Sequence, residues 1–204
     1  MASLESQNYA LRCVSQLYLS AHLNDFAIII NNDDKIPCHK TILAATSPYF
    51  EKCLFGEKDV GDELILDASK QSFLVALKFM YTGEVEFDNI DDDRLIELYP
   101  LSQSLQIKPL VDLVEHRLND IEILTKNVGK IYEALSANNS TLLNKCWQFI
   151  EENFESVIAD SDSFSKFPHD LILEIVKRYY FFAAENDIFK ALVKWQKNNS
   201  ILTV

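Results

Sequence analysis

Two residues that could do chemistry together, Cys38 and His39, are adjacent in the sequence. A thiol beside an imidazole base is a pairing that nucleophilic catalysis uses. Neighbours at the end of a strand project in different directions, however, so this pair is poorly placed to react. The histidines and cysteines lack the spacing of metal ligands, and the four glycines form no phosphate-binding loop. We therefore predict that the protein is not an enzyme and has no catalytic residue, metal site or cofactor.

Charged side chains are expected close to the same strand end. Asp25 precedes the apolar run 26–30, and Lys40 follows His39 where a helix should begin. A lysine among apolar residues needs an opposite charge, and Asp25 is the nearest candidate. The sequence predicts a buried charged cluster of Asp25, His39 and Lys40. Removing one partner of this ion pair is expected to cost about 3–5 kcal/mol.

The overall composition limits the partners. The net charge is −12 and the pI is near 4.7, which argues against binding to nucleic acid or to an anionic membrane. The sequence contains no apolar run of membrane-spanning length, and its first residues lack the features of a secretory signal. Its four scattered cysteines are typical of buried free thiols. We expect a cytoplasmic protein that is also nuclear in some settings.

The elements that would position these residues follow from hydrophobic periodicity. The apolar stripe over residues 9–21 predicts an amphipathic helix. Strands are expected at 26–30, 35–38, 64–66 and 84–87. Helices are expected at 39–45, 47–55, 69–81, 94–106 and 107–124, with Ser47 as an N-cap, Gly83 as a stop and Pro100 as an interruption.

From Thr125 onward, the pattern indicates only helices, arranged in pairs. Their expected bounds are 127–136, 141–153, 154–158, 163–167, 168–180 and 185–198. No shift in composition marks a linker between the two halves, so the halves should abut. The fold class predicted for the whole chain is α+β.

Four stretches of the first half, residues 9–124, form one recognisable pattern. They are Asn24-Asp25-Phe26, Pro37-Cys38-His39-Lys40-Thr41-Ile42-Leu43-Ala44-Ala45-Thr46-Ser47-Pro48-Tyr49-Phe50, Phe79-Met80-Tyr81-Thr82-Gly83-Glu84-Val85 and Leu98-Tyr99-Pro100-Leu101-Ser102-Gln103-Ser104-Leu105-Gln106-Ile107. With these residues the first half resembles the BTB/POZ domain, and this resemblance implies a small sheet with flanking helices.

The second half, residues 125–204, resembles the all-α BACK domain that often follows BTB. A full BACK domain would continue past residue 204, so we expect only its N-terminal part here. The residues that carry the resemblance include Cys146-Trp147-Gln148-Phe149-Ile150, Phe167-Pro168-His169-Asp170-Leu171 and Glu185-Asn186-Asp187-Ile188-Phe189. The combination resembles Kelch-like adaptors of cullin-3.

The resemblance implies a homodimer, because the first helix of BTB proteins packs against its twin in a second subunit. The dimer interface expected from it comprises Leu11, Val14, Leu17, Tyr18 and Ala21. In transcription-repressor members, the equivalents of Asp25 and Lys40 line a charged groove at the floor of the dimer. That groove is an alternative role for the charged cluster, although we favour the structural one.

The resemblance also implies a contact with cullin-3, through the loop before the third strand and the helix pair around Pro100. The residues expected in this contact are Phe55, Val60, Asp62, Tyr99 and Pro100. The loop 56–63 is shorter than usual in the family and lacks its triplet of hydrophobic residue, any residue and glutamate. Two functions stay open. One is an adaptor that links an unknown substrate protein to a cullin-3 ubiquitin ligase, and the other is a cullin-independent scaffold or transcriptional co-regulator.

Overall fold

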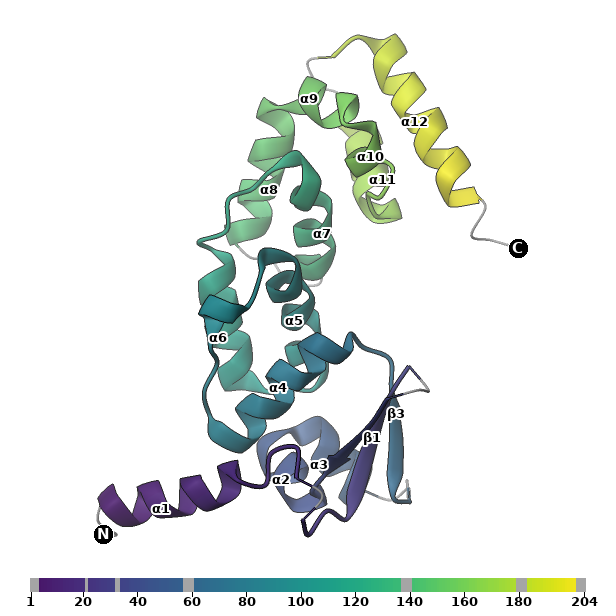
Figure 1. Ribbon diagram of the computed structural model, residues 1–204. Coiled ribbons are helices and arrows are strands. Elements are labelled where there is room, and N and C mark those ends of the chain that lie inside the picture. Colours follow the sequence, from purple (N-terminus) through teal and green to yellow (C-terminus); the bar gives the residue numbers. More distant parts are fainter. Residues whose placement is uncertain are drawn as a thin grey trace. The chain divides into compact units, whose positions relative to one another are not determined.

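A computed structural model describes residues 4–20, 22–31, 34–56, 61–136, 141–178 and 183–200. The chain divides into two compact units, Met1–Arg117 and Leu118–Val204. The described part of the first unit combines a small sheet with helices, and that of the second is built from helices (Figure 1). The α+β class predicted from the sequence is confirmed.

The sheet of the first unit has the strand order β2-β1-β3. Strand β1 (Phe26–Ile30) pairs antiparallel with β2 (Asp34–Cys38) and parallel with β3 (Glu63–Leu66). Because β1 is central, its β-branched residues Ile28 and Ile30 are fully buried. The strands predicted at 26–30, 35–38 and 64–66 match these elements within one residue.

Among the helices of the first unit, α2 (Lys40–Thr46) packs against α3 (Pro48–Phe55) and against α4 (Lys70–Thr82). Ser47 separates α2 from α3; its hydroxyl accepts the Phe50 N–H at 3.2 Å and donates to the Leu105 carbonyl at 2.5 Å. Gly83, in the left-handed conformation (φ 71°), ends α4. The elements are α1 (Leu4–Ser15), α2 (Lys40–Thr46), α3 (Pro48–Phe55), α4 (Lys70–Thr82), the 3-10 turn η1 (Phe87–Asn89), α5 (Asp92–Ser104) and α6 (Lys108–Leu118).

Three expected elements differ from the structure. The helix predicted at 9–21 begins earlier, at Leu4, and ends at Ser15. After Ser15 the backbone forms tighter i−3 bonds, from the Leu17 N–H to the Val14 carbonyl and from the Tyr18 N–H to the Ser15 carbonyl, and Leu19 then adopts a left-handed conformation (φ 55°). The strand predicted at 84–87 is wrong. Those residues lead into η1, and local bonds hold them in place of a neighbouring strand. The Glu84 N–H donates to the Thr82 hydroxyl, and the Lys78 ammonium donates to the Glu86 carboxylate. The helix predicted at 107–124 ends at Leu118.

The second unit contains the helix series that the sequence predicted, with ends shifted by a few residues. Close packing inside it depends on Gly129, since a Cβ there would lie 2.6 Å from the Phe167 ring. Trp195 donates its indole N–H to the Phe167 carbonyl at 2.8 Å and so fastens the last helix. The elements are α7 (Thr125–Leu135), α8 (Thr141–Glu152), α9 (Phe154–Ala159), α10 (Ser161–Phe164), α11 (His169–Lys177) and α12 (Glu185–Ser200).

Candidate interaction surfaces

Helix α1 carries apolar side chains that its own unit does not cover. Tyr9 is 67% exposed and Leu11 is 55% exposed, whereas Val14, Leu17 and Tyr18 are half-buried. These exposed apolar side chains are compatible with the expected dimer interface, which stays a prediction. Ala21, the fifth residue expected at the dimer interface, lies outside the described residues.

Helix α1 contacts α4, and a further attachment to its unit is made just after the helix. The Tyr18 hydroxyl donates to the Leu74 carbonyl at 3.1 Å, and its ring lies 5.9 Å from that of Tyr81. Burial raises the pKa of Tyr18, and nearby Lys78 opposes this rise. The contact fixes the base of α1 against α4 and leaves the helix itself accessible, as Figure 1 shows.

The residues expected to contact cullin-3 have unequal exposure. Phe55, at the end of α3, is 63% exposed, and Pro100 on α5 is also exposed. Tyr99 is only 1% exposed, so its expected role as a contact residue is corrected: its ring belongs to the core. Asp62 is exposed in front of β3. Val60 lies outside the described residues.

The buried charged cluster also needs correction. Of its three residues only His39 is buried, at 7% exposed, while Asp25 is on the surface. The Asp25 carboxylate accepts the backbone N–H of Lys40 at 2.8 Å, which satisfies a free donor at the start of α2. The Lys40 ammonium turns instead to Asp62, at 3.2 Å. Asp62 was expected at the partner surface, and no sequence signal linked it to Lys40.

His39 is held on both sides of its ring. Nδ1 lies 2.8 Å from the Tyr81 hydroxyl, and Nε2 lies 2.9 Å from the His22 carbonyl. The carbonyl can only accept, so Nε2 carries the proton and Nδ1 accepts from Tyr81. Burial raises the pKa of the Tyr81 hydroxyl, which keeps it available as a donor. Sequence reasoning missed Tyr81, 42 residues away in the chain.

The neighbouring thiol is unsuited to nucleophilic attack. Cys38 is fully buried, and its Sγ donates to the Ile36 carbonyl at 3.5 Å. Burial raises the pKa of this thiol to about 12, so the reactive thiolate is scarce at neutral pH. Cys146 is buried as well, but Cys13 is exposed and Cys53 is half-buried. The expectation of buried thiols therefore holds for two of the four cysteines.

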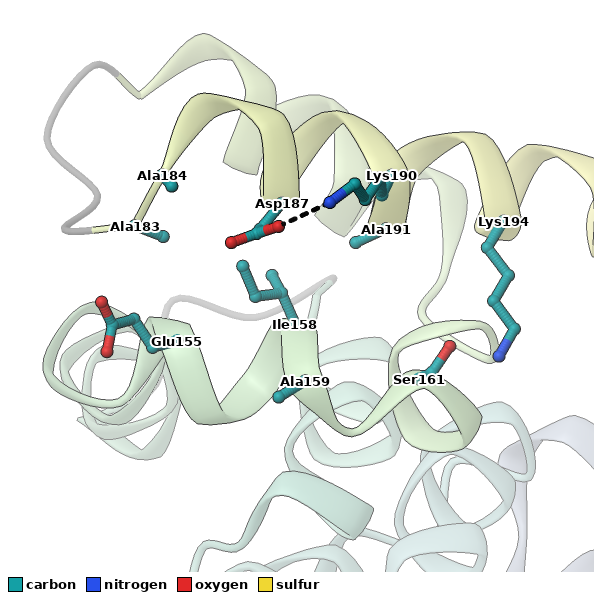
Figure 2. A pocket seen from close by; sticks show the side chains of 10 residues that line it. All are labelled: Glu155, Ile158, Ala159, Ser161, Ala183, Ala184, Asp187, Lys190, Ala191 and Lys194. Carbon is teal, nitrogen blue, oxygen red and sulfur yellow. Dashed lines mark hydrogen bonds and ion pairs between the residues drawn. The ribbon is translucent and has the colours of Figure 1, made fainter.

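In the second unit, a groove of about 520 Å³ lies between α9 and α12 (Figure 2). Ala191 lines the groove from α12, and Ala184 lines it from the position just before that helix. Ile158 faces both from α9. Its charges are mixed: Asp187 binds Lys190 at 3.1 Å, with Glu155 toward one end and Lys194 toward the other. Small apolar side chains and a paired charge do not make a catalytic constellation.

Among the described residues, no three His, Cys, Asp or Glu side chains are grouped so that they could hold a metal ion. No described helix has both the length and the apolar character needed to cross a membrane.

The family of the chain follows from comparison with known domains. The model of the BTB/POZ domain matches residues 14–122, and the model of the BACK domain, "BTB And C-terminal Kelch", matches residues 128–202. The protein belongs to the BTB/POZ family and carries a BACK domain after the BTB domain. Both are protein-interaction domains, so protein binding and an adaptor type of role are supported.

The chain is similar to part of several longer curated relatives. BTB/POZ domain-containing protein 9 is 27% identical over 198 residues in Drosophila melanogaster and 28% identical over 192 residues in Homo sapiens. Kelch-like protein 41b of Danio rerio is 26% identical over 172 residues. These matches cover 96%, 92% and 82% of this chain, but only 26%, 31% and 28% of the relatives. The chain therefore spans less than a third of their length.

Solved structures agree with the fold of the first unit. The BTB domain of human gigaxonin superposes with a TM-score of 0.50 and that of zebrafish PATZ1 with 0.51, each at 20% identity. They cover 58% and 59% of this chain, and 95% and 98% of their own chains. At this identity the likeness is one of fold.

Proposed function

We propose that the protein is a non-enzymatic adaptor that forms a homodimer through α1 and links a substrate protein to a cullin-3 ubiquitin ligase. The observation that carries the proposal is the exposure of Leu11 and Tyr9 on α1. Apolar side chains that are left in water on such a helix are stabilised when a second copy covers them.

The contact with cullin-3 rests on the BTB-BACK arrangement and on Phe55. This aromatic side chain is 63% exposed at the end of α3, next to the loop that precedes β3. Exposed aromatic residues are common anchors in protein interfaces. The free thiols Cys13 and Cys53 fit a location in the reducing cytosol or nucleus.

A second candidate function is a cullin-independent scaffold or transcriptional co-regulator that uses the same dimer. It is favoured by the sequence of loop 56–63, which lacks the family's hydrophobic-x-Glu triplet. Burial of Tyr99 removes a second expected contact. The two functions differ in one measurable property, which is affinity for cullin-3.

The dimer is tested by light scattering on the full chain and on Leu11→Glu. We expect twice the monomer mass for the wild type and the monomer mass for the variant, because the new charge would be buried at the interface. Leu173→Glu introduces the same charge at a side chain that is 43% exposed on α11, and serves as the matched control. An unchanged mass for Leu11→Glu would rule out the α1 interface.

The adaptor is tested by titrating the N-terminal region of cullin-3 into the wild type and into Phe55→Asp by calorimetry. We expect the wild type to bind cullin-3 and Phe55→Asp to bind at least about tenfold more weakly, since an anchor residue contributes about 2 kcal/mol or more. Dimers that give no heat with cullin-3 would favour the scaffold over the adaptor.

A further inference from the structure

The groove between α9 and α12 has charged side chains of opposite sign at its two ends. Glu155 lies at the end where α12 begins, and Lys194 lies at the other end (Figure 2). Both residues are exposed. Among the described residues, neither the Glu155 carboxylate nor the Lys194 ammonium forms an ion pair, whereas Asp187 and Lys190, which lie between them, bind each other. The two end charges are therefore available to a bound partner.

The floor of the groove favours a helix as the occupant. Ile158 and Ala159 line it from α9 and Ala191 lines it from α12, so the side chains there are apolar and mostly small. Residues within these two helices use their backbone N–H and C=O groups inside the helices, so an extended chain would find no row of free groups to pair with. A helix satisfies its own backbone and can lay an apolar face on such a floor.

The end charges also set the direction of that helix. Both α9 and α12 run from the Glu155 end of the groove toward the Lys194 end (Figure 2). A helix is most stable with acidic residues near its N-terminus and basic residues near its C-terminus, because these charges oppose the helix dipole. A helix of that kind meets Lys194 with its acidic end and Glu155 with its basic end only when it runs antiparallel to α12.

The length of the groove sets the spacing of the partner's charges. Along α12 the rise from Ala184 to Lys194 is about 15 Å, at 1.5 Å for each residue. Three turns of a helix, about eleven residues, cover this length and bring the last residue back to the face of the first. Residues about four and seven positions after the first lie on the same face.

We propose that the groove binds a helix of a partner protein that runs antiparallel to α12. This helix carries an acidic residue that pairs with Lys194 and, about eleven positions later, a basic residue that pairs with Glu155. Apolar residues between them cover Ile158 and Ala191. The groove belongs to the second unit, so the proposal goes beyond the proposed function and needs neither the α1 interface nor cullin-3.

Two synthetic peptides test the charge pattern. Each has about eighteen residues, is rich in alanine, has blocked ends and a fluorescent label, and carries leucines at the two apolar positions. The first peptide has glutamate at the N-terminal charged position and lysine at the C-terminal one, and the second has these charges exchanged. At low salt we expect the first to bind about tenfold more tightly in fluorescence anisotropy. Absence of binding by either peptide, or equal binding of both, overturns the proposal.

A charge exchange in the protein separates this recognition from a difference in helicity between the peptides. Protein with both Glu155→Lys and Lys194→Glu keeps its net charge and should bind the second peptide more tightly than the first. Protein with both Glu152→Lys and Lys197→Glu is the matched control, since these exposed charges do not line the groove, and it should keep the wild-type preference. An unreversed preference in the first protein, or a reversal in the control as well, contradicts the proposal.

A blocked groove shows where the peptide binds and which occupant the groove takes. Folded Ala191→Phe protein should bind the first peptide about tenfold more weakly, because the new ring fills the floor. Asn198→Phe, at an exposed position of the same helix, should bind it as the wild type does. Equal binding by Ala191→Phe and the wild type overturns the site. Self-association of the Leu11→Glu protein that Ala191→Phe abolishes would assign the groove to a second copy, and this too overturns the proposal.

Discussion

Tyr81 binds His39 at two points, since its hydroxyl accepts the His39 backbone N–H at 3.1 Å and donates to Nδ1 at 2.8 Å. The residue thereby joins α4 to the junction between β2 and α2. Through Nε2, the same imidazole reaches the His22 carbonyl in the segment that leads from α1 to β1. Three parts of the first unit depend on one tyrosine.

We expect Tyr81→Phe to lower the free energy of unfolding of the first unit by about 1–3 kcal/mol, because a buried donor and a buried acceptor would lose their partner. Urea unfolding followed by far-UV circular dichroism measures the change. Tyr18→Phe is the matched control: it removes one hydroxyl bond, to the Leu74 carbonyl, and should cost less, about 0.5–1.5 kcal/mol. Equal costs for both variants would contradict the double role of Tyr81.

Asp25 and Asp62 should contribute unequally, although both carboxylates bind Lys40. Asp25→Ala removes an acceptor for a helix N-terminal N–H and should cost about 1 kcal/mol. Asp62→Ala breaks an ion pair whose acidic side chain is 89% exposed, and should cost less than about 0.5 kcal/mol. Unfolding of both variants at matched salt decides this. A larger loss for Asp62→Ala would mean that the ion pair, and not the N–H bond, fastens this corner.

Alkaline pH should destabilise the protein through its buried thiols. Burial raises the pKa of Cys146 from its ordinary value of 9.0 to about 12. Between these values the unfolded chain has released the proton and the folded chain retains it, so the contribution is complete below about pH 9 and is lost as pH rises. The slope is about 1.4 kcal/mol per pH unit for each such thiol.

With Cys146→Ala, the unfolding free energy should therefore fall less steeply between about pH 9 and about pH 10.5. The change in slope should correspond to close to one proton released on unfolding. Its packing cost is the same at every pH and does not affect the slope. Ile150→Val, which removes a buried methyl group from the same helix and no titratable group, is the control and should leave the slope unchanged. An identical slope for wild type and Cys146→Ala would show that the buried thiol does not take part.

Gly129 provides a test in which the usual sign of a substitution is reversed. Replacing a glycine inside a helix by alanine ordinarily stabilises it by about 1 kcal/mol. Here the new Cβ would lie 2.6 Å from the Phe167 ring, which is itself buried against Phe164. We expect Gly129→Ala to destabilise the second unit by about 1–3 kcal/mol. Thermal unfolding that shows a gain in stability would mean that Phe167 can move aside at little cost.

The sequence was informative where local rules and tertiary structure agree. Ser47, followed by Pro48, predicted a helix start, and Gly83 predicted a helix stop; both are found. The isoleucines of β1 predicted a buried strand, which is central in the sheet. In each case the signal lies within a few residues of the feature, so no long-range contact was needed to find it.

Two of the errors depend on contacts between residues distant in sequence, whereas the strand expected at 84–87 is replaced by local bonds to Thr82 and Lys78. Lys40 was paired with Asp25 on the basis of charge, but the structure brings Asp62 within reach of its ammonium group and leaves only its N–H for Asp25. Continued apolar spacing after Ser15 suggested more helix, whereas the Tyr18 hydroxyl reaches Leu74 in another helix. Whether Leu11, Phe55 and Pro100 contact partners stays a prediction.

The hydroxyl bond of Tyr18 to the Leu74 carbonyl holds the end of the α1 segment, while Tyr9 and Leu11 stay exposed. Substitutions at Tyr9 or Leu11 alter side chains that the folded unit leaves in water, so they can change the choice of partner while the domain keeps its stability. New pairing specificities could therefore arise between duplicated copies of this chain by a few changes in one helix, with no need for compensating changes in the interior.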